Sequence, residues 1–476
     1  MTSKDNSYGA VMARKNEIMK AAVGVDYASF ESGSLAFDYE AMMASTGYTL
    51  EDVINIQKGF SIGNTPLIEL KNLTTLARRC APDGMGARIF IKDEAANPSG
   101  SFKVRRASVS IYHAKNHGYK GAISATSGNY GAAVASCCAK TGLRCIVVQE
   151  CFDSKGLGQP EIIEKARKCE ALGAEVVQLT VGPELFYVFL RMLEDTHYFN
   201  ASLYTTFGIA GIESLGWELA MQMREQYGCD PAMVVCTNAG GGNLTGTARG
   251  LRKAGCQAQV VAASVNLKGL HMASDHQFNL KSFTTGHTGF GMPFSTWPDR
   301  SDVPRSAARP LRYMDKYVTI NQGEVFYITE ILARLEGLEK GPAGNTSLAA
   351  AFALSQTLPQ DQCIVVQETE YTGAGKHVNA QLSFARSNGI EIRLGNPEDE
   401  IPGRSIILPE HPRLIKAREA DMSHLRHSLI KHAVGTLPEV SRDSEGHPVL
   451  DEQDVEFLAL ETNSSKEFVL QALKNL

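Results

Sequence analysis

Seven short apolar runs separated by helical patterns constrain the fold of this 476-residue chain more than any other feature. The runs are residues 87–91, 122–125, 145–148, 175–179, 233–236, 259–263 and 363–366. They are rich in β-branched residues and do not alternate strictly between apolar and polar, which is typical of strands buried on both faces of a parallel sheet. Amphipathic patterns at 160–172, 213–227 and 323–335 predict helices between them. The repetition predicts an α/β protein with doubly wound parallel sheets and right-handed crossovers.

The spacing of the runs predicts two such sheets, each in its own lobe. Residues 107–206 hold three strand–helix units and are expected to form a small lobe, with 61–106 and 207–420 forming a large one. Residues 1–60 and 421–476 are expected to be helical extensions, the second with a break near 435–448. Thr49 and Asp52 resemble a capping pair for a helix over 50–58. A ligand would lie between the lobes, at the carboxyl ends of the strands.

Charge and composition exclude several classes of function. Lys and Arg number 47 against 52 Asp and Glu, so the net charge is −5 and no general basic field exists for nucleic acid or an anionic membrane. No apolar run is long enough to span a bilayer. The ten cysteines form no C-x-x-C pair, which indicates reduced thiols in a cytoplasmic protein. The histidines at 424, 427 and 432 have no carboxylate-rich partner set, so no metal site is expected.

A lysine follows a sharp turn in the segment NPSGSFK, residues 97–103. Pro98 and Gly100 form the turn, and a helix is expected to continue from Arg105. An amine held beside apolar groups can act as a nucleophile or a base, so Lys103 is the first candidate catalytic residue. Taken alone, an ordinary exposed lysine is the alternative.

Three further loops follow predicted strands. They are TSGNYG at 126–131, AGGGNLTG at 239–246 and EYTGAGKH at 370–377. The first offers hydroxyls and N–H groups to a carboxylate, and the second lets backbone N–H groups wrap a phosphate. The second loop has neither the Walker pattern nor G-x-G-x-x-G, which disfavours a dinucleotide. In the third loop Thr372 could bond a ring nitrogen. Ordinary ligand-free turns are the alternative for each loop taken alone.

Together these signals describe one ligand. A reactive lysine, a phosphate cup, an asparagine and a threonine suit pyridoxal 5′-phosphate, in which the lysine forms a Schiff base.

The same residues carry a family resemblance. The chain resembles the fold type II pyridoxal-phosphate enzymes, which are tryptophan synthase β-like and include threonine synthase, the serine/threonine dehydratases and diaminopropionate ammonia-lyase. The markers are GNTPL at 63–67, SFK at 101–103, SGN at 127–129, the glycines at 240–242 and GPAG at 341–344. They occur in the family's order and cover about residues 60–380.

The resemblance implies a role for each marker residue. Lys103 would be the Schiff-base lysine, and the large lobe would bind the cofactor. Asn129 would bond the phenolic oxygen of the cofactor, and Thr372 its pyridine nitrogen. The phosphate would be held by Gly240, Gly241, Gly242, Asn243 and Leu244. The substrate carboxylate would be held by Thr126, Ser127 and Gly128.

Two positions depart from the family pattern. Val104 stands where an acidic residue often follows the lysine in threonine synthase-like members, and Gly341 stands where a glutamate often precedes the proline. These departures do not threaten cofactor binding, but they put a threonine synthase assignment in doubt.

Within the family, residues 1 to about 430 are similar to the β subunits of thiolases of ornithine degradation. The carrying segments are 11–17, 92–100, 159–165, 284–294 and 368–377. This resemblance implies a pyridoxal-phosphate-dependent acyltransferase that cleaves 2-amino-4-oxopentanoate with coenzyme A to acetyl-CoA and alanine. It also implies a small α subunit as partner and a homodimer of this chain within the hetero-oligomer.

Two points stay open at the level of sequence. Coenzyme A phosphates need cations, and Arg300, Arg305, Arg309 and Arg312 are candidates, although exposed arginines or a site on the partner subunit are alternatives. They lie in the Gly- and Pro-rich stretch 284–312, whose lack of periodicity indicates a functional loop. Two rival functions also remain: a lyase or synthase of this fold that uses no coenzyme A, and a catalytically silent regulatory subunit.

Overall fold

The computed structural model describes residues 5–126, 128–152, 156–158, 160–182, 184–267, 281–284, 297–299, 302–371 and 378–476, without the side chain of residue 161. The larger of its two main sheets has seven strands in the order β1-β2-β10-β7-β8-β9-β13. Their bounds are β1 Leu67–Glu69, β2 Arg88–Asp93, β7 Met233–Thr237, β8 Gln259–Val265, β9 Lys316–Ile320, β10 Cys363–Glu368 and β13 Arg418–Glu419. Neighbours from β2 to β9 are parallel, while the edge strands β1 and β13 pair antiparallel.

The smaller main sheet has four parallel strands in the order β5-β4-β3-β6. These strands are β3 Gly121–Thr126, β4 Arg144–Phe152, β5 Glu175–Thr180 and β6 Phe199–Asn200. All seven apolar runs of the sequence coincide with strands of the two sheets, with residue 87 lying just before β2. The predicted α/β class with two parallel sheets is therefore confirmed. The antiparallel edge strands were not expected, because two- and three-residue strands leave no periodic signal.

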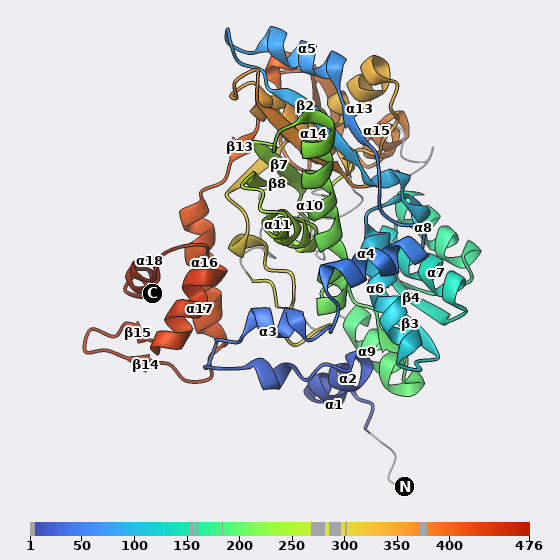
Figure 1. The fold of residues 1–476 in the computed structure, drawn as a ribbon, viewed down its shortest axis with the longest axis vertical. Coiled ribbons are helices and arrows are strands. Elements are labelled where there is room, and N and C mark those ends of the chain that lie inside the picture. Colours follow the sequence, from blue (N-terminus) through green and yellow to red (C-terminus); the bar gives the residue numbers. More distant parts are fainter. Residues whose placement is uncertain are drawn as a thin grey trace.

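Helices connect the strands and cover the sheets (Figure 1). Their bounds are α5 Lys71–Cys80, α6 Lys103–Asn116, α7 Asn129–Thr141, α8 Pro160–Ala171, α9 Glu184–Thr196, α10 Thr206–Tyr227, α11 Gly242–Lys253, α13 Gln322–Glu336, α14 Asn345–Ser355 and α15 Val378–Ser387. The three predicted helices correspond to α8, α10 and α13, although α10 begins seven residues before the predicted start at residue 213. A separate parallel pair, β11 Glu391–Gly395 and β12 Ser405–Pro409, follows α15. Among the described residues, none of the helices is long and apolar enough to cross a membrane.

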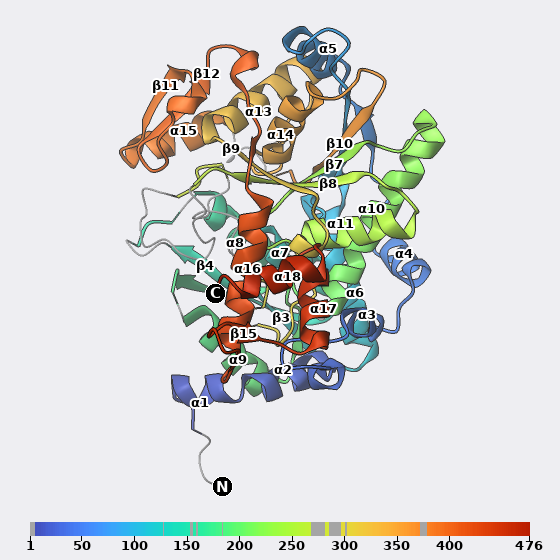
Figure 2. The ribbon, with the colours of Figure 1, turned by 90° about the vertical axis from the view of Figure 1, so that its left-hand side faces the viewer.

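Helical extensions flank the two sheets at both ends of the chain, as predicted. The first comprises α1 Tyr8–Ala13, α2 Lys15–Val23, α3 Tyr39–Ala44 and α4 Leu50–Gly59. The Thr49 hydroxyl accepts from the Asp52 N–H at 3.2 Å and the Asp52 carboxylate accepts from the Thr49 N–H at 2.9 Å, which confirms the predicted capping pair. The second comprises α16 Met422–Thr436, α17 Glu452–Glu461 and α18 Lys466–Leu473. A hairpin of β14 Ser441–Arg442 and β15 Pro448–Val449 occupies the predicted break. Figure 2 shows the molecule from the side on which these C-terminal helices lie.

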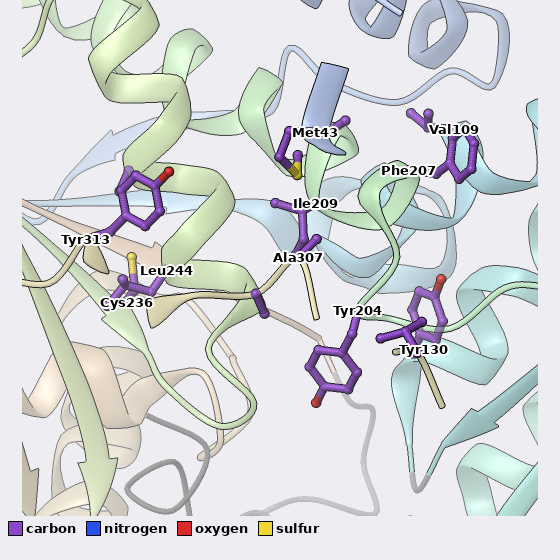
Figure 3. Close-up of a cluster of buried hydrophobic side chains, with 14 of the residues drawn as sticks. Met43, Val109, Tyr130, Tyr204, Phe207, Ile209, Cys236, Leu244, Ala307 and Tyr313 are labelled. Carbon is purple, nitrogen blue, oxygen red and sulfur yellow. The ribbon is translucent and has the colours of Figure 1, made fainter. Parts of the chain in front are cut away.

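One buried apolar cluster spans both main sheets. It contains Val147 of β4 and Cys236 of β7, both without exposed surface. Figure 3 shows part of it, with Tyr130 of α7, Ile209 of α10 and Leu244 of α11. Because a single core joins the sheets, the helices between them fix their relative placement.

Helix α10 contacts α6 on one side and α11 on the other through glycines. A Cβ on Gly211 would collide with the carbonyl oxygen of Arg105 in α6, and one on Gly216 with that of Thr247 in α11. These contacts allow backbones to approach more closely than any side chain would permit. The glycines of α10 therefore set the spacing between α6, which begins with Lys103, and α11, which follows the glycine loop.

We expect the substitution Gly216→Ala to lower the free energy of unfolding by about 2–3 kcal/mol, because the added methyl group pushes α10 away from α11. The matched control is Gly435→Ala in α16, where a Cβ would meet nothing within 4 Å. Alanine there is expected to be neutral or slightly stabilising. Urea unfolding of the full chain followed by circular dichroism measures both variants. Equal stability of the two would contradict the close-packing argument.

Candidate active site

Lys103 begins α6 directly after a turn that is hydrogen-bonded to the end of β10. The Phe102 N–H donates to the Thr369 carbonyl at 3.1 Å, and the Tyr371 N–H donates to the Gly100 carbonyl at 2.9 Å. Gly100 has a φ of 73°, in the left-handed region that glycine adopts without strain. The turn and the strand end therefore fix the position at which the lysine leaves the backbone.

A buried carboxylate joins Lys103 to Asn129. The Lys103 Nζ lies 3.7 Å from the Glu370 Oε2, and the Asn129 side-chain amide donates to that same oxygen. Glu370 is 3% exposed and Asn129 is 5% exposed. The three side chains come from the start of α6, the start of α7 and the end of β10. The structure thus brings the two predicted residues together through a third, which the sequence analysis assigned no role.

The predicted carboxylate loop lies between β3 and α7. Thr126 ends β3, and its hydroxyl accepts from the Gly128 N–H at 3.1 Å. Ser127 lies outside the described residues. A Cβ on Gly128 would stand 3.2 Å from the Nζ of Lys165, a residue of α8 that is 8% exposed. A buried cation therefore lies beside this loop, which suits a carboxylate ligand.

The glycine loop joins β7 to α11. Gly241 has a φ of 78°, and a Cβ on it would collide with Pro310. A Cβ on Gly240 would collide with the Tyr204 hydroxyl. Asn243 and Leu244 follow in the first turn of α11 and are buried. Only glycine fits this loop, and the first N–H groups of α11 have no acceptor within the helix, which makes the loop suitable for an anion.

Two predicted features lie wholly or partly outside the described residues. Thr372 is one of them. The long loop at 284–312 is described only at 284, 297–299 and from 302 onward, which leaves Arg300 out.

The described arginines of that loop do not offer free charges. Arg309 pairs with Asp299 at 2.7 Å and with Glu461 at 3.2 Å, and Arg312 pairs with the same Glu461 at 3.2 Å. Arg305 lies 3.5 Å from Asp299. The pairs of Arg309 and Arg312 with Glu461 tie the loop to the end of α17. A role of these arginines in binding coenzyme A phosphates stays a prediction.

A second ion network anchors α6, the helix that begins with Lys103. Arg105 is fully buried and donates to Glu94 at 2.7 and 2.8 Å and to Glu218 at 3.2 Å. Glu218 also accepts from Lys92 at 2.5 Å and from the Thr65 N–H at 2.9 Å. The network thus joins α6, α10, β2 and the GNTPL loop.

Four buried side chains near the site were missed from sequence. They are Arg106, Lys165, Glu368 and Glu370. Burial raises the pKa of the Glu368 carboxyl well above its ordinary value. No spacing within the sequence marks these residues, because they reach the site from three separate segments: α6, α8 and the end of β10.

Comparison with known proteins agrees with this geometry. Residues 59–369 match the family described as "Pyridoxal-phosphate dependent enzyme". A serine racemase from Dictyostelium discoideum shares the fold, with a TM-score of 0.52 at 18% identity over 68% of this chain and 97% of that one.

Two sequence relatives extend over the whole chain. One is a "2-amino-4-ketopentanoate thiolase beta subunit" from Acetoanaerobium sticklandii, 69% identical over 100% of this chain and 99% of the relative. Another protein of that name, from an unknown prokaryotic organism, is 60% identical over the same shares. The chain therefore belongs to the pyridoxal-phosphate-dependent enzymes, in the family of these thiolase beta subunits.

The residues at the site fit the cofactor of this family, pyridoxal phosphate. A lysine amine is present at the strand ends. Neighbouring side chains pack so closely on the glycine loop that only glycine fits at residues 240 to 242, and the helix start that follows offers backbone N–H groups to an anion. Both polar atoms of the Asn243 side chain are buried without a hydrogen-bond partner in the described part of the chain. Such groups need a ligand to satisfy them.

The ion network predicts a loss of stability in acid. Burial acts to raise the pKa of Glu218, but the charges of Arg105 and Lys92 outweigh it and hold that pKa at about 2. The stabilisation from the ionised form is complete above the unfolded pKa of about 4.5 and is lost as pH falls towards 2. We expect Glu218→Gln to remove up to about 3 kcal/mol of this pH dependence.

The measurement is urea unfolding at a series of pH values from 7 down to 2.5. The control variant is Glu225→Gln, at an exposed position of the same helix. If the free energy of unfolding of the Glu218→Gln variant fell with decreasing pH as steeply as that of the wild-type chain, the ion network would not determine the acid sensitivity.

Proposed function

We propose that this chain is the catalytic β subunit of a thiolase that cleaves 2-amino-4-oxopentanoate with coenzyme A to acetyl-CoA and alanine. The observation that carries the proposal is the full-length identity of 69% to a relative named for this activity. The amine of Lys103, placed against Glu370 at the strand ends, supports it.

The reaction balances without an oxidant or reductant. The bond between the β-carbon and the γ-carbonyl carbon breaks, and a bond forms between that carbonyl carbon and the thiol sulfur. The thiol proton is returned to the β-carbon, which becomes the methyl group of alanine. The chain must therefore deliver a proton to the β-carbon. The α-proton has to leave and return as well, so that the electron sink at the α-carbon can stabilise the charge that forms at the β-carbon.

Bound pyridoxal phosphate supplies an electron sink for bonds at the substrate α-carbon. Lys103 would hold and move the proton there, since its Nζ is the amine at the site. Glu370, 3.7 Å from this Nζ, would orient the amine and accept a proton from it. Asn129, bonded to the same carboxylate, would keep that carboxylate in place.

Other residues of the site would bind the cofactor and the substrate carboxylate. Asn129 would also meet the phenolic oxygen of the cofactor and Thr372 its ring nitrogen, while the loop at 240–244 would hold its phosphate. Thr126, Ser127 and Gly128 would hold the substrate carboxylate. Lys165 adds a positive charge beside that loop.

Direct transfer of the acetyl group to coenzyme A fits the cysteines of this chain. All ten are free thiols. Burial raises the pKa of Cys151 to about 11 and that of Cys169 and Cys236 to about 12, so these thiols are protonated at neutral pH and poor nucleophiles. Free thiols also suit the cytoplasmic location that we propose.

We further propose the division into lobes expected from the sequence: 107–206 as the small lobe, and 61–106 with 207–420 as the cofactor lobe. The name of the relatives, a beta subunit, supports a small α subunit as partner. A homodimer of this chain within that assembly completes the proposal.

The decisive experiment measures acetyl-CoA formed from 2-amino-4-oxopentanoate and coenzyme A. The purified chain is assayed with and without the small α subunit of a homologous thiolase. We expect coenzyme A-dependent acetyl-CoA and equimolar alanine, and we expect Lys103→Ala to abolish both the turnover and the visible absorbance of the bound cofactor.

Other outcomes would replace the proposal. Conversion of the amino acid without coenzyme A would indicate a lyase of the same fold. Absence of both cofactor absorbance and turnover would indicate a regulatory subunit. Retained thiolysis by Lys103→Ala would exclude this lysine as the proton carrier.

The carboxylate beside the lysine generates a separate prediction. We expect Glu370→Gln to lower kcat roughly 100-fold and to change the acidic side of the pH–rate profile, while the affinity for pyridoxal phosphate changes little. Glu370→Asp should recover part of the rate because it keeps the charge. The control is Glu410→Gln, at an exposed position after β12. A Glu370→Gln variant with normal kcat and an unaltered pH profile would rule out this role.

A further inference from the structure

Two nitrogen atoms of the buried Arg106 guanidinium lack hydrogen-bond partners among the described residues. It lies in α6, three residues after Lys103, and is 3% exposed. Its Nε and Nη2 atoms have no hydrogen-bond partner in the described ranges of the chain. The Arg106 guanidinium carbon lies 5.9 Å from the ring centre of Phe102, in a cation–π contact.

The guanidinium lies against the start of the glycine-loop helix. A Cβ on Gly242, the first residue of α11, would collide with the Arg106 Nη2 and stand 3.0 Å from the Ile209 Cδ1. The absence of a side chain at residue 242 is thus what lets Arg106 reach the helix start. In Figure 3, Ile209 and Leu244 mark this region of the core.

A buried charge without a partner is costly, and an anion would relieve the cost. Burial lowers the pKa of Arg106, and the hydroxyls of Tyr130 and Tyr204 offset this only in part. Asn243, 7% exposed and also without a partner, lies at the same helix start. Two unsatisfied buried side chains and a helix N-terminus therefore converge on one anion site.

The spacing along α6 identifies which anion this is. Residues three apart on a helix lie on the same face, so Lys103 and Arg106 face the same side of α6. The aldehyde and the phosphate ester of pyridoxal phosphate are neighbouring substituents of one ring. One helix can therefore hold both, with the amine at the aldehyde and the guanidinium at the phosphate.

We infer that Arg106 binds the cofactor phosphate together with the backbone of the glycine loop and makes this chain selective for the phosphorylated cofactor. The inference rests on the proposed placement of the cofactor at this loop. The substrate carboxylate is a poorer candidate, because Lys165 already lies beside the loop proposed for it.

The test compares pyridoxal phosphate with pyridoxal, which lacks the phosphate. Each is titrated into the cofactor-free full chain, and the dissociation constants are measured by absorbance. We expect Arg106→Met to weaken pyridoxal phosphate roughly 10- to 100-fold while leaving pyridoxal unchanged. Arg106→Lys should lose less, since it keeps the charge without the fork. The control is Arg334→Met, whose side chain is 72% exposed.

A second measurement uses inorganic phosphate as the probe. It should raise the midpoint of thermal unfolding of the wild-type chain but not that of the Arg106→Met variant. This readout needs neither the pyridine ring nor turnover, and a variant that fails to fold would show no cooperative transition at all.

Several results would overturn the inference. One is an unchanged preference for the phosphorylated cofactor in Arg106→Met. Another is an equal loss of affinity for both compounds, which would indicate a purely structural role. If the wild-type chain bound pyridoxal phosphate and pyridoxal with equal affinity, there would be no phosphate site to assign. A failed thiolase assay with an intact phosphate preference would reject only the proposed reaction.

Discussion

The buried charges around Arg105 hold the pieces of the site in one frame. Arg105 sits two residues after Lys103 and makes ion pairs with Glu94 and Glu218, while Glu218 holds Lys92 and the loop before β1. Removing one member of such a cluster leaves another charge buried and unpaired. The helix that carries the reactive amine therefore cannot shift without disturbing β2 and α10 as well.

Close packing of α10 extends this frame to the glycine loop. The glycines of α10 bring its backbone against α6 on one side and α11 on the other. The amine of Lys103 in α6 and the anion site at the start of α11 are thus positioned by close backbone contacts with α10. A separate set of ion pairs, from Arg309 and Arg312 to Glu461, attaches the C-terminal helices to the same body.

Most strands of the two main sheets were predictable from continuous apolar runs, although the buried strands β9 and β12 were missed. The runs at 145–148 and 363–366 lie within β4 and β10, because continuous β-branched sequence has few alternatives in an α/β chain. The edge strands β1 and β13 were missed, since two or three residues hold no period and their pairing is decided by the strand beside them. The strands β14 and β15 were missed in the same way.

The sequence alone determined the fold class, the candidate lysine and the order of the loops, because turn chemistry and apolar periodicity are local properties. Only the tertiary structure decided which side chains meet. Glu370 reaches Lys103 across 267 residues of sequence, and Arg106 reaches Gly242 because glycine leaves space there. Such encounters depend on how helices and strands from distant segments pack around one core, and no local pattern in the chain encodes them.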